Sequence, residues 1–119
     1  MIAMVIDSDE KKLMQTKAYL EKRNITAVTF QDPMAAVKYS YNNDVDVVYT
    51  EVLLPHITGV DITNLLRKRN AGIQICFLTD TDQYLHIGKK YSIAGYYIKP
   101  FLEEGQNKNL IDTSKMSYG

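Results

Sequence analysis

The strongest constraint on the fold is a short apolar segment that leads into a charged residue. Residues 45–49 contain three valines and a tyrosine, and the run is too short and too continuous for an amphipathic helix. It is typical of a strand buried on both faces of a parallel sheet. Glu51 follows, and Pro55, four residues later, cannot continue a strand. We therefore expect Glu51 at the end of a central strand, where open α/β sheets build their sites. A plain solvated carboxylate would give the same local pattern.

Apolar runs of this kind alternate with helical patterns along the whole chain. Asp7 and Glu10 form a candidate capping pair for the first helix, Asp32-Pro33 begins the second, and residues 79–82 are expected to cap the fourth. Strand and helix alternate five times with short connections, which predicts a doubly wound α/β fold with helices on both faces of a parallel sheet. The expected strands are residues 2–6, 26–30, 45–49, 73–78 and 94–98.

Length and charge limit the functions to consider. The 119 residues form one domain, with 14 basic and 14 acidic residues and a net charge of zero. This balance gives no electrostatic reason to expect direct binding to nucleic acid or to a membrane. The single cysteine, Cys76, cannot form an internal disulfide, which fits a reducing compartment, and no apolar stretch is long enough to span a membrane. A cytoplasmic location is expected.

The C-terminal segment differs from the rest of the chain. Residues 1–101 carry the strand and helix patterns and form the expected core of the domain. In residues 102–119, Gly105, Asn107 and Asn109 are poor helix formers. We expect this segment to be a short, frayed or displaced fifth helix, or a connector.

Polar side chains stand at the ends of four of the five expected strands. Asp7 and Ser8 follow the first strand, Glu51 the third, Thr79 the fourth and Lys99 the fifth. In a doubly wound sheet these ends meet at one edge, and the switch point between the first and third strands faces a crevice. We therefore expect one site with two carboxylates, two hydroxyls and a lysine.

With these residues in place, the chain resembles a receiver domain of the response regulators of two-component systems. The resemblance covers about residues 1–101 and implies a CheY-like, flavodoxin-like fold with five parallel strands in the order 2-1-3-4-5. It implies a signalling module rather than an enzyme, phosphorylated on an aspartate by a histidine kinase. The motifs that carry it are residues 5–10, Leu53-Leu-Pro55 with Gly59, Phe77-Leu-Thr79 and residues 95–101.

The resemblance also implies roles for individual positions. Glu51 falls on the phospho-acceptor position, and Asp7 and Ser8 on the two acids that bind Mg²⁺. Further positions are the hydroxyl, the aromatic switch and the lysine that contacts the phosphoryl group, here Thr79, Tyr96 and Lys99.

Three positions depart from the family pattern. Glu51 replaces the acceptor aspartate, and its extra methylene moves the carboxylate by about 1.5 Å, so we expect it to pair with Lys99 and to imitate the phosphorylated state. Ser8 removes one carboxylate and leaves Asp7 and Glu51 as the acids of the metal site, which weakens Mg²⁺ binding. Asp9 is the obvious replacement ligand, but at the start of the helix we expect it to serve as the cap instead. Asp80 stands where a small residue is usual, either as a helix cap or as a charge that hinders a phosphodonor.

We interpret the chain as an atypical receiver domain that is not phosphorylated in the usual way. It is expected to control an output domain, such as a transcriptional one, through a homodimer formed by the fourth helix, fifth strand and fifth helix. One alternative is a receiver phosphorylated on another acid, Asp9 or Asp80. Another is a flavodoxin-like module that binds a nucleotide or flavin. The acidic, glycine-free turn at residues 7–10 disfavours phosphate binding unless a cation intervenes.

Overall fold

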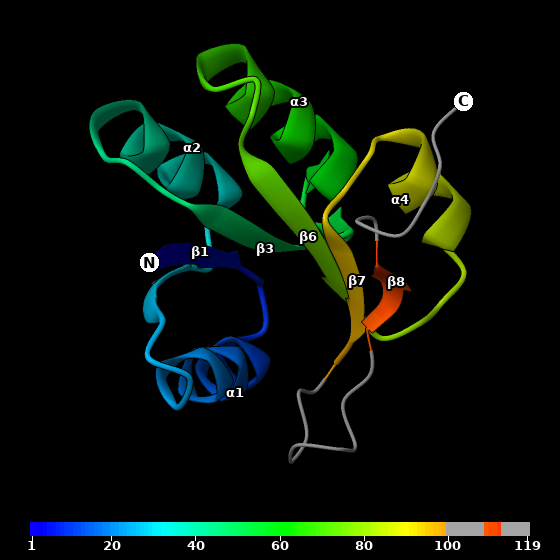
Figure 1. The fold of residues 1–119 in the computed structure, drawn as a ribbon, viewed down its shortest axis with the longest axis horizontal. Coiled ribbons are helices and arrows are strands. Elements are labelled where there is room, and N and C mark those ends of the chain that lie inside the picture. Colours follow the sequence, from blue (N-terminus) through cyan, green and yellow to red (C-terminus); the bar gives the residue numbers. More distant parts are fainter. Residues whose placement is uncertain (100–108, 113–119) are drawn as a thin grey trace.

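A central parallel sheet organises the computed structural model, which describes residues 1–99 and 109–112. Within these residues the strand order is β2-β1-β3-β6-β7-β8 (Figure 1). Neighbours from β2 to β7 are parallel, and β8 pairs with β7 in the antiparallel direction. The first five strands in this order correspond to the predicted 2-1-3-4-5 arrangement, which is therefore confirmed. The strands are β1 (Ile2–Ile6), β2 (Thr26–Phe30), β3 (Val47–Glu51), β6 (Gln74–Thr79), β7 (Gly95–Ile98) and β8 (Asn109–Asp112).

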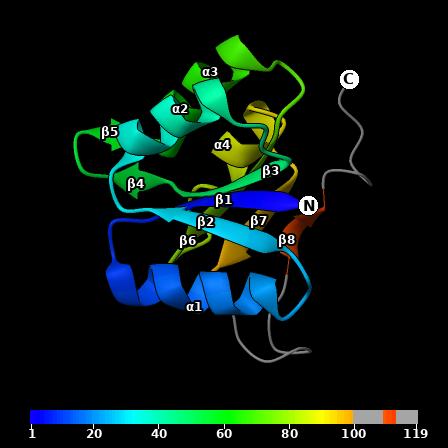
Figure 2. The same ribbon diagram turned by 90° about the vertical axis from the view of Figure 1, so that its left-hand side faces the viewer.

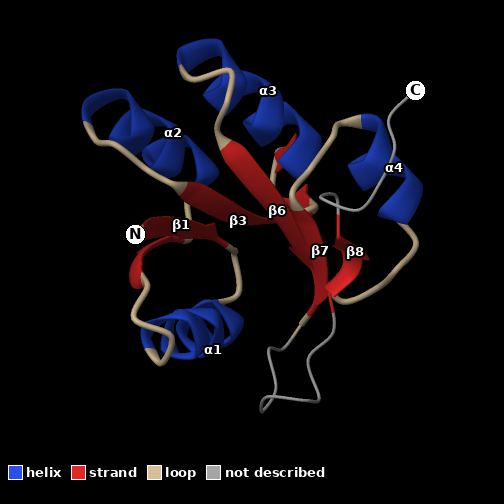
Figure 3. Cartoon of the chain, viewed as in Figure 1, coloured by secondary structure: helices blue, strands red, loops and turns tan. Residues whose placement is uncertain are grey.

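Helices cover both faces of the sheet (Figure 3). In the described part of the chain α1 lies on one face, while α2, α3 and α4 lie on the other (Figure 2). Side chains of successive strand residues point to opposite faces, so β1, β2, β3, β6 and β7 each contribute to two apolar clusters, one under each helix layer. This explains why the strands are continuous apolar runs. The helices are α1 (Glu10–Glu21), α2 (Pro33–Asn42), α3 (Gly59–Arg69) and α4 (Leu85–Lys90).

The start of α1 is set by Asp9 and not by Asp7. The Asp9 carboxylate accepts a hydrogen bond of 3.2 Å from the backbone N of Lys12, which satisfies a free amide of the first turn. The predicted capping pair of Asp7 with Glu10 is therefore wrong, and the expected cap at Asp9 is confirmed. Asp7 directly follows β1, two residues before the N-cap, and its side chain lines the pocket at the strand ends.

The cap predicted for the fourth helix at residues 79–82 is also wrong. β6 runs to Thr79, and α4 begins only at Leu85, after Tyr84, which makes no side-chain capping hydrogen bond. Residues 80–84 are a loop at the edge of the crevice. The sequence pattern misled because an acidic residue after a strand can serve equally well as a helix cap or as the partner of a basic residue far away in the sequence. Asp80 forms such an ion pair, with Lys12.

The region after β3 holds a small hairpin that the sequence did not predict. β4 (Leu53–Leu54) pairs antiparallel with β5 (Ile57–Thr58), and His56 turns the chain at a positive φ of 67°. Thr58 then caps α3 through a reciprocal pair of hydrogen bonds with Asp61. The hairpin places the start of α3 directly beside the end of β3.

The prediction for residues 102–119 is only partly open to comparison. Residues 109–112 form strand β8 and not a helix; the remainder of the predicted fifth helix lies outside the described residues. The positions of Pro100 and Phe101, within the predicted core 1–101, lie outside them as well. Among the helices that are described, none is long and apolar enough to cross a membrane.

Candidate functional site: an ion-paired pocket at the strand ends

The carboxyl ends of β1, β3, β6 and β7 open into one pocket. The sheet order places these four ends side by side, and the loop at residues 80–84 and the first turn of α1 form its rim. Five of the residues predicted to meet there do so: Asp7, Ser8, Glu51, Thr79 and Lys99. The other lining residues are Asp9, Lys12, Leu53, Asp80, Thr81, Gln83 and Tyr84.

Lys99 joins the two carboxylates at the floor of this pocket. Its Nζ donates to Asp7 Oδ2 at 2.7 Å and forms an ion pair with Glu51 Oε2. All three side chains are buried, with 1% of the Asp7, 9% of the Glu51 and 2% of the Lys99 side chain exposed. The backbone N of Lys99 also donates to the carbonyl of Thr79 at 2.8 Å, which fixes the end of β7 against β6.

The other two carboxylate oxygens are held by backbone amides. Asp7 Oδ1 accepts from the backbone N of Asp9 at 3.0 Å. Glu51 Oε1 accepts from the backbone N of Val52 at 2.7 Å and from that of Leu53 at 3.4 Å. Each of the four carboxylate oxygens therefore has a partner within the chain, and the three charged groups together carry a charge of minus one.

The pKa of Lys99 reflects this arrangement. Burial alone favours the neutral amine and lowers the pKa. The hydrogen bonds and charges of Asp7 and Glu51 act in the opposite direction and outweigh burial, so the pKa is raised above its ordinary value. The lysine stays charged, as a buried cation with two anionic partners should.

A glycine fixes the position of Glu51 from behind. The backbone N of Gly59, at the start of α3, donates to the carbonyl of Val52 at 2.7 Å. A Cβ at Gly59 would lie 2.7 Å from the carbonyl oxygen of Glu51, closer than a methyl group can approach. Only glycine lets α3 pack this closely against the end of β3.

Tyr96 points into the protein and holds the loop at the rim. Its ring is fully buried and packs edge-on against Phe77. Its hydroxyl donates to the carbonyl of Thr81 at 2.8 Å and accepts from the backbone N of Tyr84 at 3.3 Å. Burial raises the pKa of this tyrosine. Thr79, at the start of the same loop, is 3% exposed.

A second ion pair crosses the rim of the pocket. Lys12 Nζ, from α1, lies 2.7 Å from Asp80 Oδ1 at the end of β6. The pair is far more exposed than the floor, with 30% of the Lys12 and 63% of the Asp80 side chain accessible. The hydrogen bond from Lys12 holds the pKa of Asp80 below its usual range. Sequence analysis missed Lys12, because nothing in the local pattern connects it to a residue 68 positions away.

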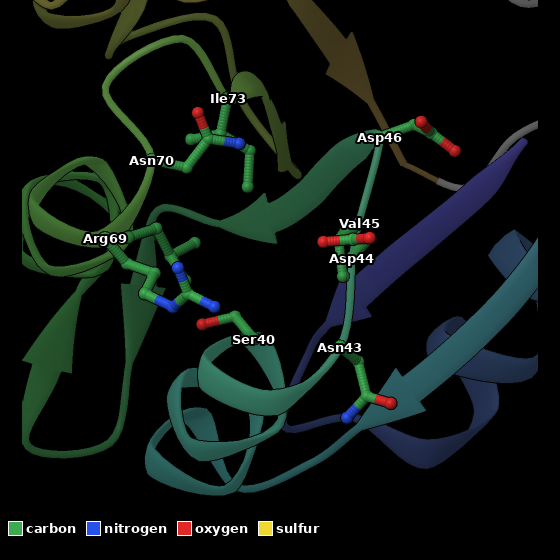
Figure 4. A pocket seen from close by; sticks show the side chains of 9 residues that line it. Ser40, Asn43, Asp44, Val45, Asp46, Arg69, Asn70 and Ile73 are labelled. Atoms are coloured by element: carbon green, nitrogen blue, oxygen red, sulfur yellow. The ribbon is translucent and has the colours of Figure 1, made fainter.

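A further pocket lies at the opposite end of the sheet, between the ends of α2 and α3 (Figure 4). The Arg69 guanidinium bonds to the carbonyl of Tyr41 there, at 2.9 and 3.3 Å. Arg67 bonds to the carbonyls of Tyr91 and Ser92. Arg67 and Arg69 thus hold neighbouring chain segments in place.

Comparison with known proteins identifies the family. The sequence model of the response regulator receiver domain matches residues 3–111. The chain belongs to the response regulator receiver domain family. It is 30% identical over 105 residues to the transcriptional regulatory protein CusR of Escherichia coli, a match that covers 82% of the chain and 44% of CusR. It is also 25% identical over 100 residues to the alkaline phosphatase synthesis transcriptional regulatory protein PhoP of Bacillus subtilis, a match that covers 82% of the chain and 42% of PhoP. The chain thus spans less than half the length of these relatives.

Solved structures of receiver domains have the same fold. The receiver domain of the Francisella response regulator 1452 is 25% identical, with a TM-score of 0.74 and 85% of both chains covered. The response regulator TrrA of Thermotoga maritima, solved with Mg²⁺ and BeF, is 20% identical with a TM-score of 0.78, covering 87% of this chain and 90% of that one. The latter likeness concerns the fold alone.

The receiver family implies a Mg²⁺ ion in this pocket, and the residues present do not fit one well. Mg²⁺ requires an octahedral shell of oxygen ligands. Here the space between Asp7 and Glu51 is bridged by the Lys99 ammonium. Ser8 brings no carboxylate, and that of Asp9 caps α1. Within residues 1–99 and 109–112, no group of three or more acidic, histidine or cysteine residues is arranged to hold a metal.

Proposed function

We propose that this receiver domain is a signalling and interaction module that does not require phosphorylation. The observation that carries the proposal is the buried ion pair of Lys99 with Glu51, shared with Asp7. The longer side chain of Glu51 brings its carboxylate to the lysine, where the phosphoryl group of an ordinary receiver would make that contact. The negative charge that phosphorylation would supply is thus built into the sequence.

The position of Glu51 also argues against phosphoryl transfer to it. In-line transfer depends on the mutual placement of nucleophile, metal and stabilising cation, and an error near 1 Å can reduce the rate on the order of a hundredfold. Both oxygens of Glu51 already have hydrogen-bonding partners. A nucleophile in this state would have to break a buried ion pair before it could attack.

The inward position of Tyr96 supports a domain held in one signalling state. In the family, an inward aromatic residue accompanies the active arrangement of the face formed by the fourth helix and fifth strand. Here Tyr96 fixes residues 81 and 84, which lead into α4. We propose that the face made by α4 and β7 forms a homodimer without a phosphoryl signal.

The partners follow from the relatives. CusR and PhoP are named as transcriptional regulatory proteins, and the matched part is less than half of each. We propose that this domain controls an output domain of that kind by its dimerisation, and that any histidine kinase acts on it through contact. The setting proposed for it is the cytoplasm, without direct binding to nucleic acid or membrane by the domain itself.

A second candidate is phosphorylation on another acid. Asp9 and Asp80 are the near candidates, but the Asp9 carboxylate caps α1 and Asp80 pairs with Lys12 at the rim. Each carboxylate is thus already engaged in another interaction. The flavin or nucleotide alternative has no support from the family match, and the acidic turn after β1 opposes it.

Intact mass spectrometry tests the proposal. The unmodified chain, the variant Glu51→Asp and the control Glu51→Gln are incubated with a small acyl-phosphate donor and Mg²⁺. We expect no phosphoryl adduct on the unmodified chain or on Glu51→Gln. An adduct on Glu51→Asp alone would show that the glutamate silences the pocket, whereas no adduct on any variant would show that the metal site is lost as well. An adduct on the unmodified chain contradicts the proposal.

A further inference from the structure

The geometry points to Lys99 as the resident cation of the pocket. We infer that its ammonium group replaces a divalent metal between Asp7 and Glu51, so that the domain keeps its arrangement without Mg²⁺. Removal of the ammonium should convert the two carboxylates into a divalent-metal site. The inference deepens the proposed function and rests on its assignment of the site, not on the absence of phosphorylation.

The hydrogen bonds leave no carboxylate oxygen uncommitted. Each acid gives one oxygen to Lys99 and the other to backbone amides. An ammonium has three donors, and two of them are used by these acids. A metal at the same place would have to compete with the lysine for both carboxylates at once.

The charges at the pocket floor also disfavour a divalent metal beside Lys99. Asp7 and Glu51 contribute two negative charges and Lys99 one positive charge, so the floor carries minus one. A divalent cation beside the ammonium would be repelled at short range in a buried site, where charges are poorly screened. Ser8, which replaces the second acid of the family, cannot restore the missing charge.

Lys99 cannot leave its position at low cost. Its side chain is 2% exposed, and its backbone N is tied to Thr79 in the sheet. If the side chain is shortened to a neutral one, two buried carboxylates face each other without a counter-ion, which is strongly unfavourable. A divalent cation from solvent would relieve that repulsion, and the lysine variant should therefore gain affinity for metal as it loses stability.

Mn²⁺ titration followed by electron paramagnetic resonance tests the inference on the full chain. The proteins are the unmodified chain, Lys99→Met, Lys99→Met with Asp7→Asn, and Lys12→Met. The last is the matched control, since it removes a lysine from the same pocket but not from between the carboxylates. We expect Lys99→Met to bind one Mn²⁺ at least about tenfold more tightly than the unmodified chain, because both the occupant and the repulsion are gone. Asp7→Asn should abolish this gain.

Three results would overturn the inference. The unmodified chain could bind Mn²⁺ as tightly as Lys99→Met, Lys12→Met could gain as much, or folded Lys99→Met could bind none. If Lys99→Met does not fold, the inference is tested instead on the unmodified chain, by nuclear magnetic resonance in the presence of Mn²⁺. Resonances of the Asp9 and Val52 amides should not be broadened selectively by millimolar Mn²⁺, and selective broadening refutes the idea. A phosphoryl adduct would contradict the proposed function alone, whereas Mn²⁺ between the acids of the unmodified chain would contradict this inference alone.

Discussion

Lys99 Nζ lies 2.7 Å from Asp7 Oδ2, which connects the ends of β7 and β1 across 92 positions of sequence. β3 and β6 lie between these two strands in the sheet. The ion pair therefore spans the crevice, and Glu51 at the end of β3 completes it from the middle. A contact of this kind ties together the strand ends on which a receiver domain builds its switch.

The alkaline stability of the domain should depend on this lysine. The pKa of Lys99 is raised in the folded state, so its stabilising contribution is complete below the ordinary lysine value of 10.5. As the pH rises above 10.5, the unfolded chain loses its proton first and the contribution is lost through the folded pKa. We expect the difference in free energy of unfolding between the unmodified chain and Lys99→Met to shrink in this range. Urea denaturation at pH 8 to about 11 measures it.

Other groups also titrate at high pH, and the comparison cancels them. Burial raises the pKa of Cys76 to about 12 and raises that of Tyr49 as well. Both groups are present in the unmodified chain and in the variant, so their contributions are the same in each. A constant difference between the two proteins up to pH 11 would show that Lys99 is not preferentially charged in the folded state.

Breaking the buried ion pairs of Lys99 with Asp7 and Glu51 should change the oligomeric state of the domain. Glu51→Ala and Lys99→Ala each remove one partner of the buried ion pair, and each should release the arrangement proposed to hold the dimer face. We expect a shift of the monomer–dimer balance in both variants, measured by sedimentation velocity at several concentrations. Loss of stability is also expected, on the order of 3–5 kcal/mol for a broken buried pair, so circular dichroism must show that the variants are folded. An unchanged balance in two folded variants would count heavily against the proposed function.

Much of the fold follows from the sequence because it depends on local patterns. The apolar runs became β1, β2, β3, β6 and β7. Those of β1, β3 and β6 are buried on both faces, whereas most residues of the edge strand β2 are only half-buried. Asp32 with Pro33 begins α2 as the pattern predicts. The strand order followed from the connections and from the family resemblance. The convergence of Asp7, Glu51 and Lys99 was predictable for the same reason, since parallel strand ends share one edge of the sheet.

The parts that were missed depend on contacts between distant residues. Asp80 reads locally as a cap, but the ammonium of Lys12 lies within reach only once α1 and β6 are packed side by side. Asp9 was correctly expected to cap α1, but the competing pair of Asp7 with Glu10 fails because β1 extends to Ile6 and the Asp7 side chain lines the pocket. Local sequence could not distinguish these alternatives, since a carboxylate serves equally well as a cap, an ion-pair partner or a ligand.

Removal of the rim charge at Asp80 should open the pocket to anions without affecting the fold. Its side chain is 63% exposed, and an exposed ion pair contributes little to stability, about 0–1 kcal/mol. In a Glu51→Asp background, Asp80→Ala should increase the rate of labelling by an acyl-phosphate donor, because a negative charge at the rim is gone. Asp82→Ala, two residues further on, is the matched control. Equal labelling rates of Glu51→Asp with and without Asp80→Ala would show that Asp80 does not control access to the pocket.

Gly59→Ala should destabilise the domain far more than a glycine-to-alanine change at the start of a helix usually does. The added Cβ would lie 2.7 Å from the Glu51 carbonyl oxygen and 3.2 Å from Val52 Cα, and both are backbone atoms that cannot rotate away. Overpacking of this kind costs about 1–3 kcal/mol. Gly72→Ala is a fitting control, because the nearest atom to its Cβ is a side-chain oxygen at 3.8 Å. The free energies of unfolding of the two variants, measured by urea denaturation, should differ by at least about 1 kcal/mol.

The displaced β3 end should also weaken the contact of Glu51 with Lys99. Gly59→Ala should therefore shift the monomer–dimer balance in the same direction as Glu51→Ala, while Gly72→Ala leaves it unchanged. Equal stability of the two glycine variants would mean that the start of α3 can move away from β3, and that Glu51 is not held from behind.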